Sequence, residues 1–395
     1  MQKIKTDFAI IFRGDCMKLL KIEAKGLPLF KQDIDINFIA SQRVSEEDRN
    51  SLHALFSNVY LNPTEAIIGI NASGKTSALK VILLALGILN NDPINHLDCK
   101  DILGKSENAV IKIIYFSDTK DIYQIETGIR YENETGRYVI TSETIWKKSS
   151  ESVKLKKSIF EFNDGMIVTR RNNEEEFLSD DVSIVIAQNK KNREHMVVTD
   201  MREFTNINVL PVSDNIPEAV ITFLDPSVES LKFENNENKT IIRLKFVQQE
   251  EIILNNTKEL DNYLSSGTIK GIVVFTQAMK GLGTGGYMVV DEIENHFNKE
   301  IVSTLIRFFM DIRLNKNGAV LIFTTHYPEL LDEYDRNDSI FITRNRNGIT
   351  IENLSKILTR NDIKKSDAYQ SGFLEGTTPA YDAYMKLKKS ISSYV

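Results

Sequence analysis

The chain has 395 residues, of which 42% are hydrophobic and 26% charged, a globular composition that excludes a disordered tail protein or a coiled-coil rod. Its 49 basic and 55 acidic residues give a formal charge of −6, so any contact with nucleic acid must come from a local basic patch. Apolar runs such as 81–86 are too short to span a bilayer, and the stretch 8–12 is too short for a signal-peptide core. The two cysteines cannot form a disulfide framework or a zinc cluster. We therefore expect a cytoplasmic protein without a membrane partner.

The first half of the chain is expected to begin with strands. Residues 17–40 alternate apolar and polar side chains in places and predict two strands around a turn, and residues 45–58 are expected to be helical. A short apolar strand at 65–69 leads through a glycine-containing turn into an apolar-periodic helix over 74–90. The stretch 109–188 is rich in β-forming residues. Within it we expect strands at 109–116, 121–130 and 182–187, and loops at 147–157 and 170–181.

The second half changes character towards its end. A helical region is expected at 215–232 and a hairpin at 239–254, whereas residues 355–395 predict a small helical tail. Between them helices and strands alternate, which is typical of βα units and a mainly parallel sheet. The expected elements of this part are helices at 266–281 and 297–313 and strands at 287–291, 318–324 and 338–344.

A phosphate-binding loop is predicted where the strand at 65–69 meets the following helix. The run Gly-Ile-Asn-Ala-Ser-Gly-Lys-Thr at 69–76 matches G-x-x-x-x-G-K-[ST]. The glycines let successive N–H groups face phosphate oxygens, and the helix adds its positive end. Lys75 brings a charge to the β- and γ-phosphates, and Thr76 offers a hydroxyl to Mg²⁺. The expected nucleotide-binding residues here are Gly69, Asn71, Ala72, Ser73, Gly74, Lys75, Thr76 and Ser77.

Two later strands end in residues suited to the same chemistry. The strand at 287–291 ends at Asp291, which can hold Mg²⁺, and Glu292 is placed to polarise a water for attack on the γ-phosphate. The alternative is an ordinary strand ending in an acidic turn. The strand at 320–325 is followed by His326, 34 positions after Glu292. A lone histidine is more often structural, but this one follows a parallel-type strand and is expected to contact the γ-phosphate.

A second helix start carries hydroxyls and a glycine. Leu264-Ser265-Ser266-Gly267-Thr268 comes immediately before an apolar helical stretch at 269–280. Such a helix N-terminus can bind an anion, although taken alone it would be read as a simple N-cap.

The order of these four motifs resembles ABC-type ATPases. The resemblance covers about residues 17–345 and is nearest to the soluble branch of chromosome, repair, OLD-like and anti-phage ATPases. It implies an α/β fold: a P-loop ATPase core of mixed sheet flanked by helices, an antiparallel β lobe and a small helical insert. We accordingly expect an N-terminal ATPase lobe at 17–145, an insert at 146–260, a C-terminal ATPase lobe at 261–350 and a helical tail at 351–395.

The resemblance also implies a mechanism with ATP and Mg²⁺ as cofactors. The signature motif, with Ser265, Ser266 and Gly267, would cap the ATP held by the phosphate loop of another copy, so that a homodimer or higher homo-oligomer closes around two nucleotides. Ser266 stands where many family members have glycine. Glu292 would be the base and His326 would steady the γ-phosphate. Gln188 would sense Mg²⁺ and the attacking water, and Asn295 and Asn298 would lie near the dimer seam.

Three functions remain open from the sequence. The first is a slow ATPase that serves as sensor or scaffold in a bacterial anti-phage system, resembling the ATPase subunits of the PARIS, Septu and AbiL type. It would control a separate nuclease or toxin and respond to a phage protein or DNA. The second is a DNA-repair or chromosome-organising ATPase that clamps DNA, although no sustained heptads occur in 147–260. The third binds ATP without appreciable turnover. Basic stretches at 146–157 and 190–193 suit either a phosphate backbone or a solvated loop.

Overall fold

The computed structural model describes residues 17–171, 178–192, 195–204, 210, 216–236, 239–374, 376 and 381–394. These residues form a mixed α/β structure with two six-stranded sheets and smaller sheets of three and two strands. The expected α/β class is therefore present. Among the described residues, no helix combines the length and the apolar character needed to cross a bilayer.

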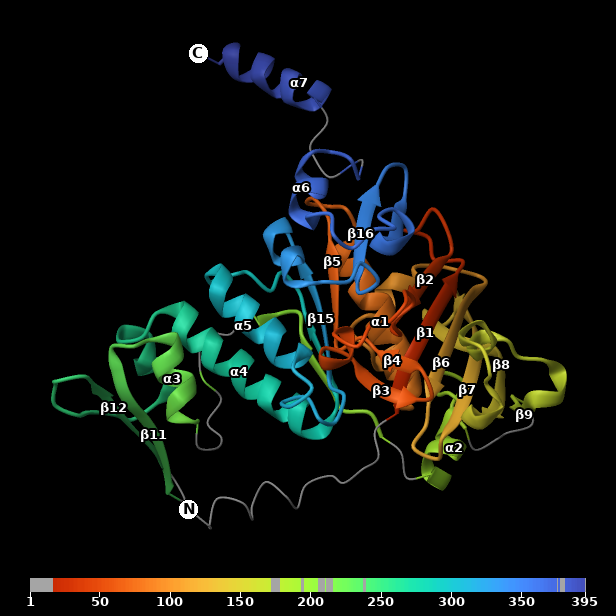
Figure 1. The fold of residues 1–395 in the computed structure, drawn as a ribbon, viewed down its shortest axis with the longest axis horizontal. Helices are drawn as coiled ribbons and strands as arrows, with labels where there is room; N and C mark the ends of the chain where they lie inside the picture. The colour runs from red at the N-terminus through yellow and green to blue at the C-terminus, as the bar shows by residue number, and fades with distance from the viewer. Residues whose placement is uncertain are drawn as a thin grey trace.

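The first large sheet is antiparallel throughout and lies at the right in Figure 1. The expected strands at its centre are confirmed, because each alternates side chains between a buried and a more exposed face or is buried along most of its length. In spatial order its strands are β2 (Ile34–Asn37), β1 (Lys18–Lys25), β6 (Ala109–Phe116), β7 (Asp121–Glu132), β8 (Arg137–Ser149) and β9 (Ile167–Arg170).

The second large sheet is mixed and carries the candidate site. Its strands read as continuous apolar runs because both faces of the sheet are covered. The strand β5, from the N-terminal part of the chain, lies between two strands from the C-terminal part. In order the strands are β10 (Val198–Met201), β14 (Tyr287–Val290), β15 (Val320–Thr325), β5 (Thr64–Ile68), β16 (Ile340–Asn345) and β17 (Ile349–Asn353). Only β17 runs antiparallel to its neighbour in this sheet.

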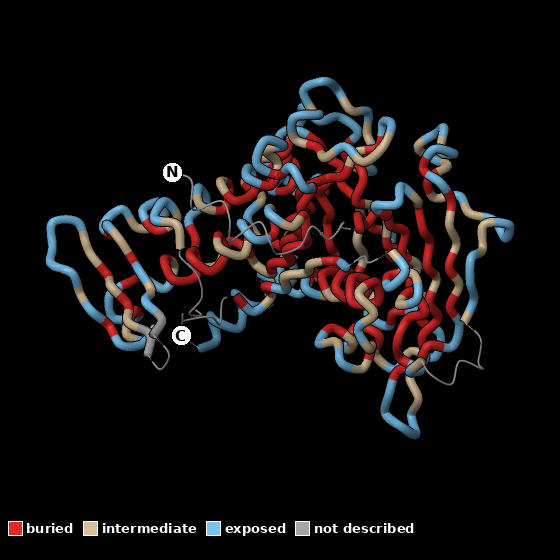
Figure 2. Tube along the Cα trace, turned by 90° about the horizontal axis from the view of Figure 1, so that it is seen from below, coloured by how far each residue is buried: buried red, intermediate tan, exposed pale blue. Residues whose placement is uncertain are grey.

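Helices cover both faces of the mixed sheet, and Figure 2 shows buried residues throughout this region. The helix α1 (Lys75–Leu89) packs between the two large sheets, so nearly all its side chains are buried. The helices α4 (Ser266–Thr284) and α5 (Lys299–Met310) pack on the opposite face. Alternation along the strands divides the core in two. Val289, Ile322 and Phe341 belong to the α1 side, and Met288, Leu321 and Phe323 to the α4–α5 side.

Smaller elements surround these layers. The helix α3 (Glu218–Leu224) and the strands β11 (Val228–Asn236), β12 (Lys239–Phe246) and β13 (Ile252–Leu254) extend beyond α4 in Figure 1. The hairpin β3 (His53–Phe56) and β4 (Val59–Leu61) lies near β1. At the C-terminal end, α6 (Lys365–Gln370) packs on the body, whereas α7 (Tyr381–Ser392) projects away from it. The expected hairpin at 239–254 and the helical tail are thus confirmed.

Two expected elements are wrong. Residues 45–58 form a single turn and then β3, because Ser45 and Asp48 exchange hydrogen bonds of 2.7 and 3.1 Å that close the turn locally. Residues 182–187 are not a strand, since helix α2 (Val185–Asn192) begins there. The Ser183 hydroxyl accepts the N–H of Val185, the first residue of α2, and the buried Glu143 carboxylate accepts the N–H of the preceding Ile184. Local periodicity does not reveal these partners.

The expected helix at 215–232 is shorter than predicted. Helix α3 ends at Leu224, and the chain then enters β11, which pairs with β12 along its whole length. Pairing with a partner strand therefore overrides the helical pattern of the later residues. β8 likewise continues to Ser149, three residues into the loop expected from 147. Residues 172–177 of the second expected loop and residues 1–16 lie outside the described residues.

Candidate functional site

The loop after β5 has the close packing that a phosphate-binding loop requires. A Cβ atom at Gly69 would lie 2.2 Å from Ser73 Oγ and 2.4 Å from Thr343 Oγ1, so only glycine fits there. Gly74 adopts a φ of +100°, a conformation that other L residues rarely reach. Lys75 Nζ folds back onto the loop and donates to the carbonyl oxygens of Gly69 at 2.9 Å and Ile70 at 3.3 Å.

Three parallel strands bring the predicted residues to one edge of the mixed sheet. The strands β14, β15 and β5 are direct neighbours, and side chains after their carboxyl ends therefore meet. Thr76, which follows the loop, donates a 2.6 Å hydrogen bond to Asp291 Oδ2, which follows β14. His326, which follows β15, lies 3.2 Å from Lys75 Nζ through its Nδ1 atom. Residues more than 200 positions apart thus form one cluster.

Glu292 is held at this edge by two side chains. Asn295 Nδ2 donates to Glu292 Oε2 at 2.6 Å, and His326 Nε2 lies 3.3 Å from Glu292 Oε1. The hydrogen bond from Asn295, together with His326 and Lys75, lowers the pKa of Glu292 below its ordinary value against the effect of burial. The residue also has a φ of +48°, which is uncommon for a residue with a side chain and turns the chain sharply after β14.

Lys75 is the positive group of the cluster, and His326 lies beside it. Burial lowers the pKa of Lys75, while the carboxylates of Glu292, Asp291 and Glu294 oppose that shift. The backbone N–H of His326 donates to Glu294 Oε1 at 2.6 Å, which fixes the segment after β15 to the turn after β14. Electrostatically, the site therefore combines a lysine with three nearby carboxylates.

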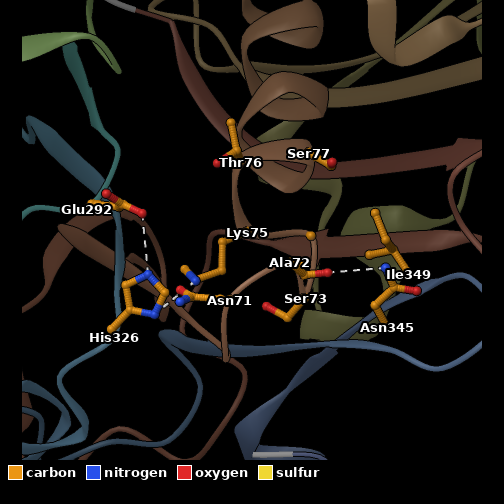
Figure 3. A pocket seen from close by; sticks show the side chains of 11 residues that line it. Asn71, Ala72, Ser73, Lys75, Thr76, Ser77, Glu292, His326, Asn345 and Ile349 are labelled. Carbon is orange, nitrogen blue, oxygen red and sulfur yellow. Dashed lines mark hydrogen bonds and ion pairs between the residues drawn. The ribbon is translucent and has the colours of Figure 1, made fainter. Parts of the chain in front are cut away.

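A cavity of about 320 Å³ opens beside this cluster. Figure 3 shows Glu292 and His326 at one end, Lys75 in the middle, and Asn345 with Ile349 at the other. Seven expected loop residues from Asn71 to Ser77 line the cavity, together with Glu292 and His326. Gly69 and Asp291 do not line it, although both contact residues that do.

Sequence reasoning missed the far end of this cavity. Asn345 Nδ2 donates to the Ala72 carbonyl at 3.1 Å, and the Ile349 side chain covers the space above Gly74, where an added Cβ would lie 2.5 Å from Cγ2. Both residues belong to the β16–β17 hairpin, whose tip carries Gly348 at a φ of +113°. The Asn-Gly pair at 347–348 is a hairpin signal in the sequence, but nothing local places that hairpin against the phosphate loop.

The second predicted helix start lies away from this cavity. Ser265 is the N-cap of α4, and its Oγ accepts from the Thr268 N–H at 3.0 Å. Ser265 and Ser266 are both exposed. Gly267 faces His296, whose carbonyl oxygen would lie 2.7 Å from an added Cβ. The close backbone approach therefore occurs at position 267, which is glycine, and leaves room for a serine at 266.

The expected role of Gln188 is not supported by its position. Gln188 lies on α2 and donates to Tyr123 Oη at 2.9 Å and to Asn192 Oδ1 at 3.1 Å. Its neighbour Asn189 donates to the Leu89 carbonyl at the C-terminal end of α1, whereas the phosphate loop precedes the N-terminal end. At 1.5 Å per residue those ends are about 20 Å apart. The expectation assumed a strand at 182–187, whereas helix α2 begins there, and the strands beside β14 are β10 and β15.

The residues present fit a Mg²⁺–nucleotide complex. Within the described residues, no group of three or more His, Cys, Asp and Glu side chains is arranged to hold a metal ion. Mg²⁺ bound with a nucleotide needs few protein ligands, because phosphate oxygens and water complete its octahedron. The Thr76 hydroxyl and the Asp291 carboxylate, already in hydrogen-bond contact, supply oxygen ligands of the kind Mg²⁺ prefers.

Comparison with known proteins gives little further information. No protein-family model matches the chain, and no curated protein matches it significantly. Among solved structures, the chain is similar to the recombination mediator protein RecF with ATPrS, at a TM-score of 0.42 and 10% identity, over 86% of this chain and 99% of that one. It is also similar to RecF with ATP, at a TM-score of 0.39 and 13% identity, over 86% and 100%. At such values the likeness carries no conclusion about function.

Proposed function

We propose that this chain binds Mg²⁺–ATP and hydrolyses it to ADP and phosphate. The observation that carries the proposal is the meeting of Lys75 and Thr76 with Asp291, Glu292 and His326 at one sheet edge. A phosphate loop alone supports binding, but a carboxylate beside its lysine adds a base for hydrolysis. The proposed activity therefore depends on residues 75–76 and 291–326, which are far apart in the sequence and meet in the fold.

Each residue has a distinct part in this reaction. The N–H groups of 72–77 and the Lys75 ammonium would hold the phosphates, once Lys75 exchanges its carbonyl partners for phosphate oxygens. Thr76 and Asp291 would hold Mg²⁺, which neutralises phosphate charge when bound. Glu292 would accept a proton from the attacking water. The water oxygen would form a bond to the γ-phosphorus as the bond from that phosphorus to ADP breaks. His326, hydrogen-bonded to Glu292, would stabilise the charge that develops on the γ-phosphate.

We further propose that two copies bind ATP between them, as in ABC-type ATPases. The exposed Ser265 and Ser266 begin a 19-residue helix outside the cavity of their own chain, where they are accessible to the nucleotide of a second copy. A helix N-terminus of this kind attracts phosphate. Residues 292–297 connect the two regions, since Glu292 faces the cavity while His296 packs on Gly267.

The biological role we propose is that of an ATP-dependent sensor or scaffold in anti-phage defence, controlling a separate nuclease or toxin. The shape of the insert supports this over a chromosome-organising role. Between α1 and α4, the described helices α2 and α3 have eight and seven residues, far from the heptad arms of a DNA-clamping ATPase.

The enzymatic proposal is tested with purified protein and two variants. Lys75→Ala should weaken Mg²⁺–ATP binding at least tenfold in a fluorescent-nucleotide titration, because a charged phosphate contact is lost. Glu292→Gln should retain binding while losing most phosphate release, because the amide cannot accept the proton. Lys280→Ala, on the exposed end of α4, is the control. Equal turnover by wild type and Glu292→Gln would reject Glu292 as the base, and absence of nucleotide binding would reject the proposal.

The biological role is tested by capture from cells. A tagged Glu292→Gln chain, expressed with its chromosomal neighbours and supplied with Mg²⁺–ATP, would be purified and its partners identified by mass spectrometry. A stoichiometric nuclease or toxin-like protein supports the defence role, particularly if Lys75→Ala fails to retain it. Recovery of repair proteins with DNA would favour the genome-maintenance alternative.

A further inference from the structure

We infer that Thr324 is a positioning residue that sets both acidic side chains of the site. The inference rests on the proposed ATPase function and adds a residue that belongs neither to the phosphate loop nor to the acidic pair. Thr324 is fully buried near the end of β15, and it does not line the cavity. Its effect on the reaction would therefore pass through the residues it contacts.

The Thr324 hydroxyl makes two hydrogen bonds to consecutive residues of the acidic turn. It donates to Asp291 Oδ1 in a short contact, and it accepts the backbone N–H of Glu292 at 2.8 Å. A threonine hydroxyl has one proton to donate and can also accept, so it can make both hydrogen bonds at once. Thr76, the other hydroxyl on Asp291, makes its hydrogen bond to the Oδ2 atom of that residue.

The first bond determines which oxygen of Asp291 remains for the metal. With Oδ1 occupied by Thr324, Oδ2 points to Thr76, to which it is bonded at 2.6 Å. The Asp291 carboxylate is thus held between two hydroxyls in one rotamer. Such outer contacts usually orient the direct ligands of a metal and change its affinity when removed.

The second bond supports the unusual backbone of Glu292. That residue has a φ of +48°, a conformation that costs free energy unless surrounding contacts hold it. Two hydrogen bonds to Thr324 do so: its hydroxyl accepts the Glu292 N–H, and its carbonyl oxygen accepts the Ile293 N–H at 3.1 Å. The turn thereby directs the Glu292 side chain towards His326 and the cavity.

The test compares three substitutions at the end of β15. Thr324→Val keeps the shape but removes the hydroxyl, and Thr324→Ser keeps the hydroxyl. Thr325→Val is the matched control: Thr325 is equally buried, and its hydroxyl accepts the Tyr327 N–H at 3.0 Å without contacting either acid. Each protein would be measured for kcat and KM, for the Mg²⁺ concentration giving half-maximal turnover, and for fluorescent-ATP binding with and without Mg²⁺.

We expect Thr324→Val to lower kcat and raise the Mg²⁺ requirement by about 10- to 100-fold, the usual effect of losing an outer contact. Its nucleotide affinity without Mg²⁺ should stay at the wild-type value, because the phosphate loop is unchanged. Thr324→Ser should restore turnover and Mg²⁺ dependence, and Thr325→Val should leave both unchanged.

Two results would overturn the inference. The first is a Thr324→Val chain with wild-type kcat and wild-type Mg²⁺ dependence. The second is a Thr325→Val chain with the same losses as Thr324→Val, because equal losses would show a general effect on folding. A wild-type chain that binds no Mg²⁺–ATP would overturn the proposed function as well. Wild-type turnover with an unaffected Thr324→Val would overturn this inference alone.

Discussion

Replacing Gly267 by alanine tests the contact between the start of α4 and the acidic turn. The added methyl group would lie 2.7 Å from the carbonyl oxygen of His296, whereas ordinary contacts begin at 3.4 Å. The neighbour is backbone rather than a flexible side chain, and His296 has a φ of +72°, so its turn has few alternatives. We therefore expect the two segments to separate by about 0.7 Å, the difference between those distances.

The size of the effect follows from two opposing contributions. Overpacking of this kind costs about 1–3 kcal/mol, while replacing a helical glycine by alanine returns about 0.5–1 kcal/mol. The free energy of unfolding should fall by about 1–2 kcal/mol. Because Glu292 lies four residues before His296 in the same turn, a displacement of several tenths of an ångström should reduce kcat by about tenfold or more.

Gly283→Ala provides the matched control in the same helix. An added Cβ at Gly283 meets nothing within 4 Å, so this variant should be as stable as wild type or up to about 1 kcal/mol more stable. Chemical denaturation would measure stability, and phosphate release would measure kcat. Fluorescent-ATP titration should show unchanged affinity in Gly283→Ala, because that residue touches neither the phosphate loop nor the start of α4.

Wild-type stability and turnover in Gly267→Ala would refute this reasoning. Such a result would mean that the His296 turn moves freely and does not transmit the position of the α4 start to Glu292. A loss of nucleotide affinity equal to the loss of kcat would point instead to a general disturbance of the fold.

Three further predictions concern charge. Asn295→Ala should move the acidic limb of the ATPase pH profile to higher pH, because Asn295 lowers the pKa of Glu292 and the ionised carboxylate is the active form. Burial, with Lys18 nearby, lowers the pKa of His53 to about 4, so the unfolded chain binds more protons than the folded chain between pH 6.5 and 4. The free energy of unfolding, measured by denaturant titration, should therefore fall by up to roughly 3 kcal/mol as the pH is lowered across that range. Lys18→Met should reduce the free energy of unfolding by about 3–5 kcal/mol, because Lys18 Nζ bonds the carbonyl oxygens of residues 285, 317 and 318 at 2.7–2.9 Å.

Each of these has a defined contrary result. An unchanged acidic limb in Asn295→Ala would show that this amide does not set the ionisation of Glu292. For His53, the reference is His53→Leu, whose loss of stability on acidification should be smaller than that of wild type. A Lys18→Met chain as stable as wild type would mean that water replaces the ammonium at those carbonyl groups.

The phosphate loop was predictable from the sequence because its chemistry is local. Eight consecutive residues supply the glycines, the lysine and the hydroxyl, and the adjoining strand and helix have strong periodicity. The places of Asp291, Glu292 and His326 also followed from the sequence. Apolar runs alternating with helices indicate parallel strands, and the carboxyl ends of parallel strands meet at one edge. The catalytic roles assigned to these residues remain predictions.

Contacts across the fold were decided only by the tertiary structure. Asn345 and Ile349 reach the phosphate loop because β16 lies beside β5, a neighbour more than 270 positions away in the chain. Thr324 contacts the acidic turn because β15 lies beside β14. The strand expected before Gln188 was wrong for a similar reason. The alternation of apolar and polar residues does not show that Ser183 and Glu143 accept the N–H groups at the start of a helix. Local physics determines which groups a segment offers, and packing between distant segments determines which groups they meet.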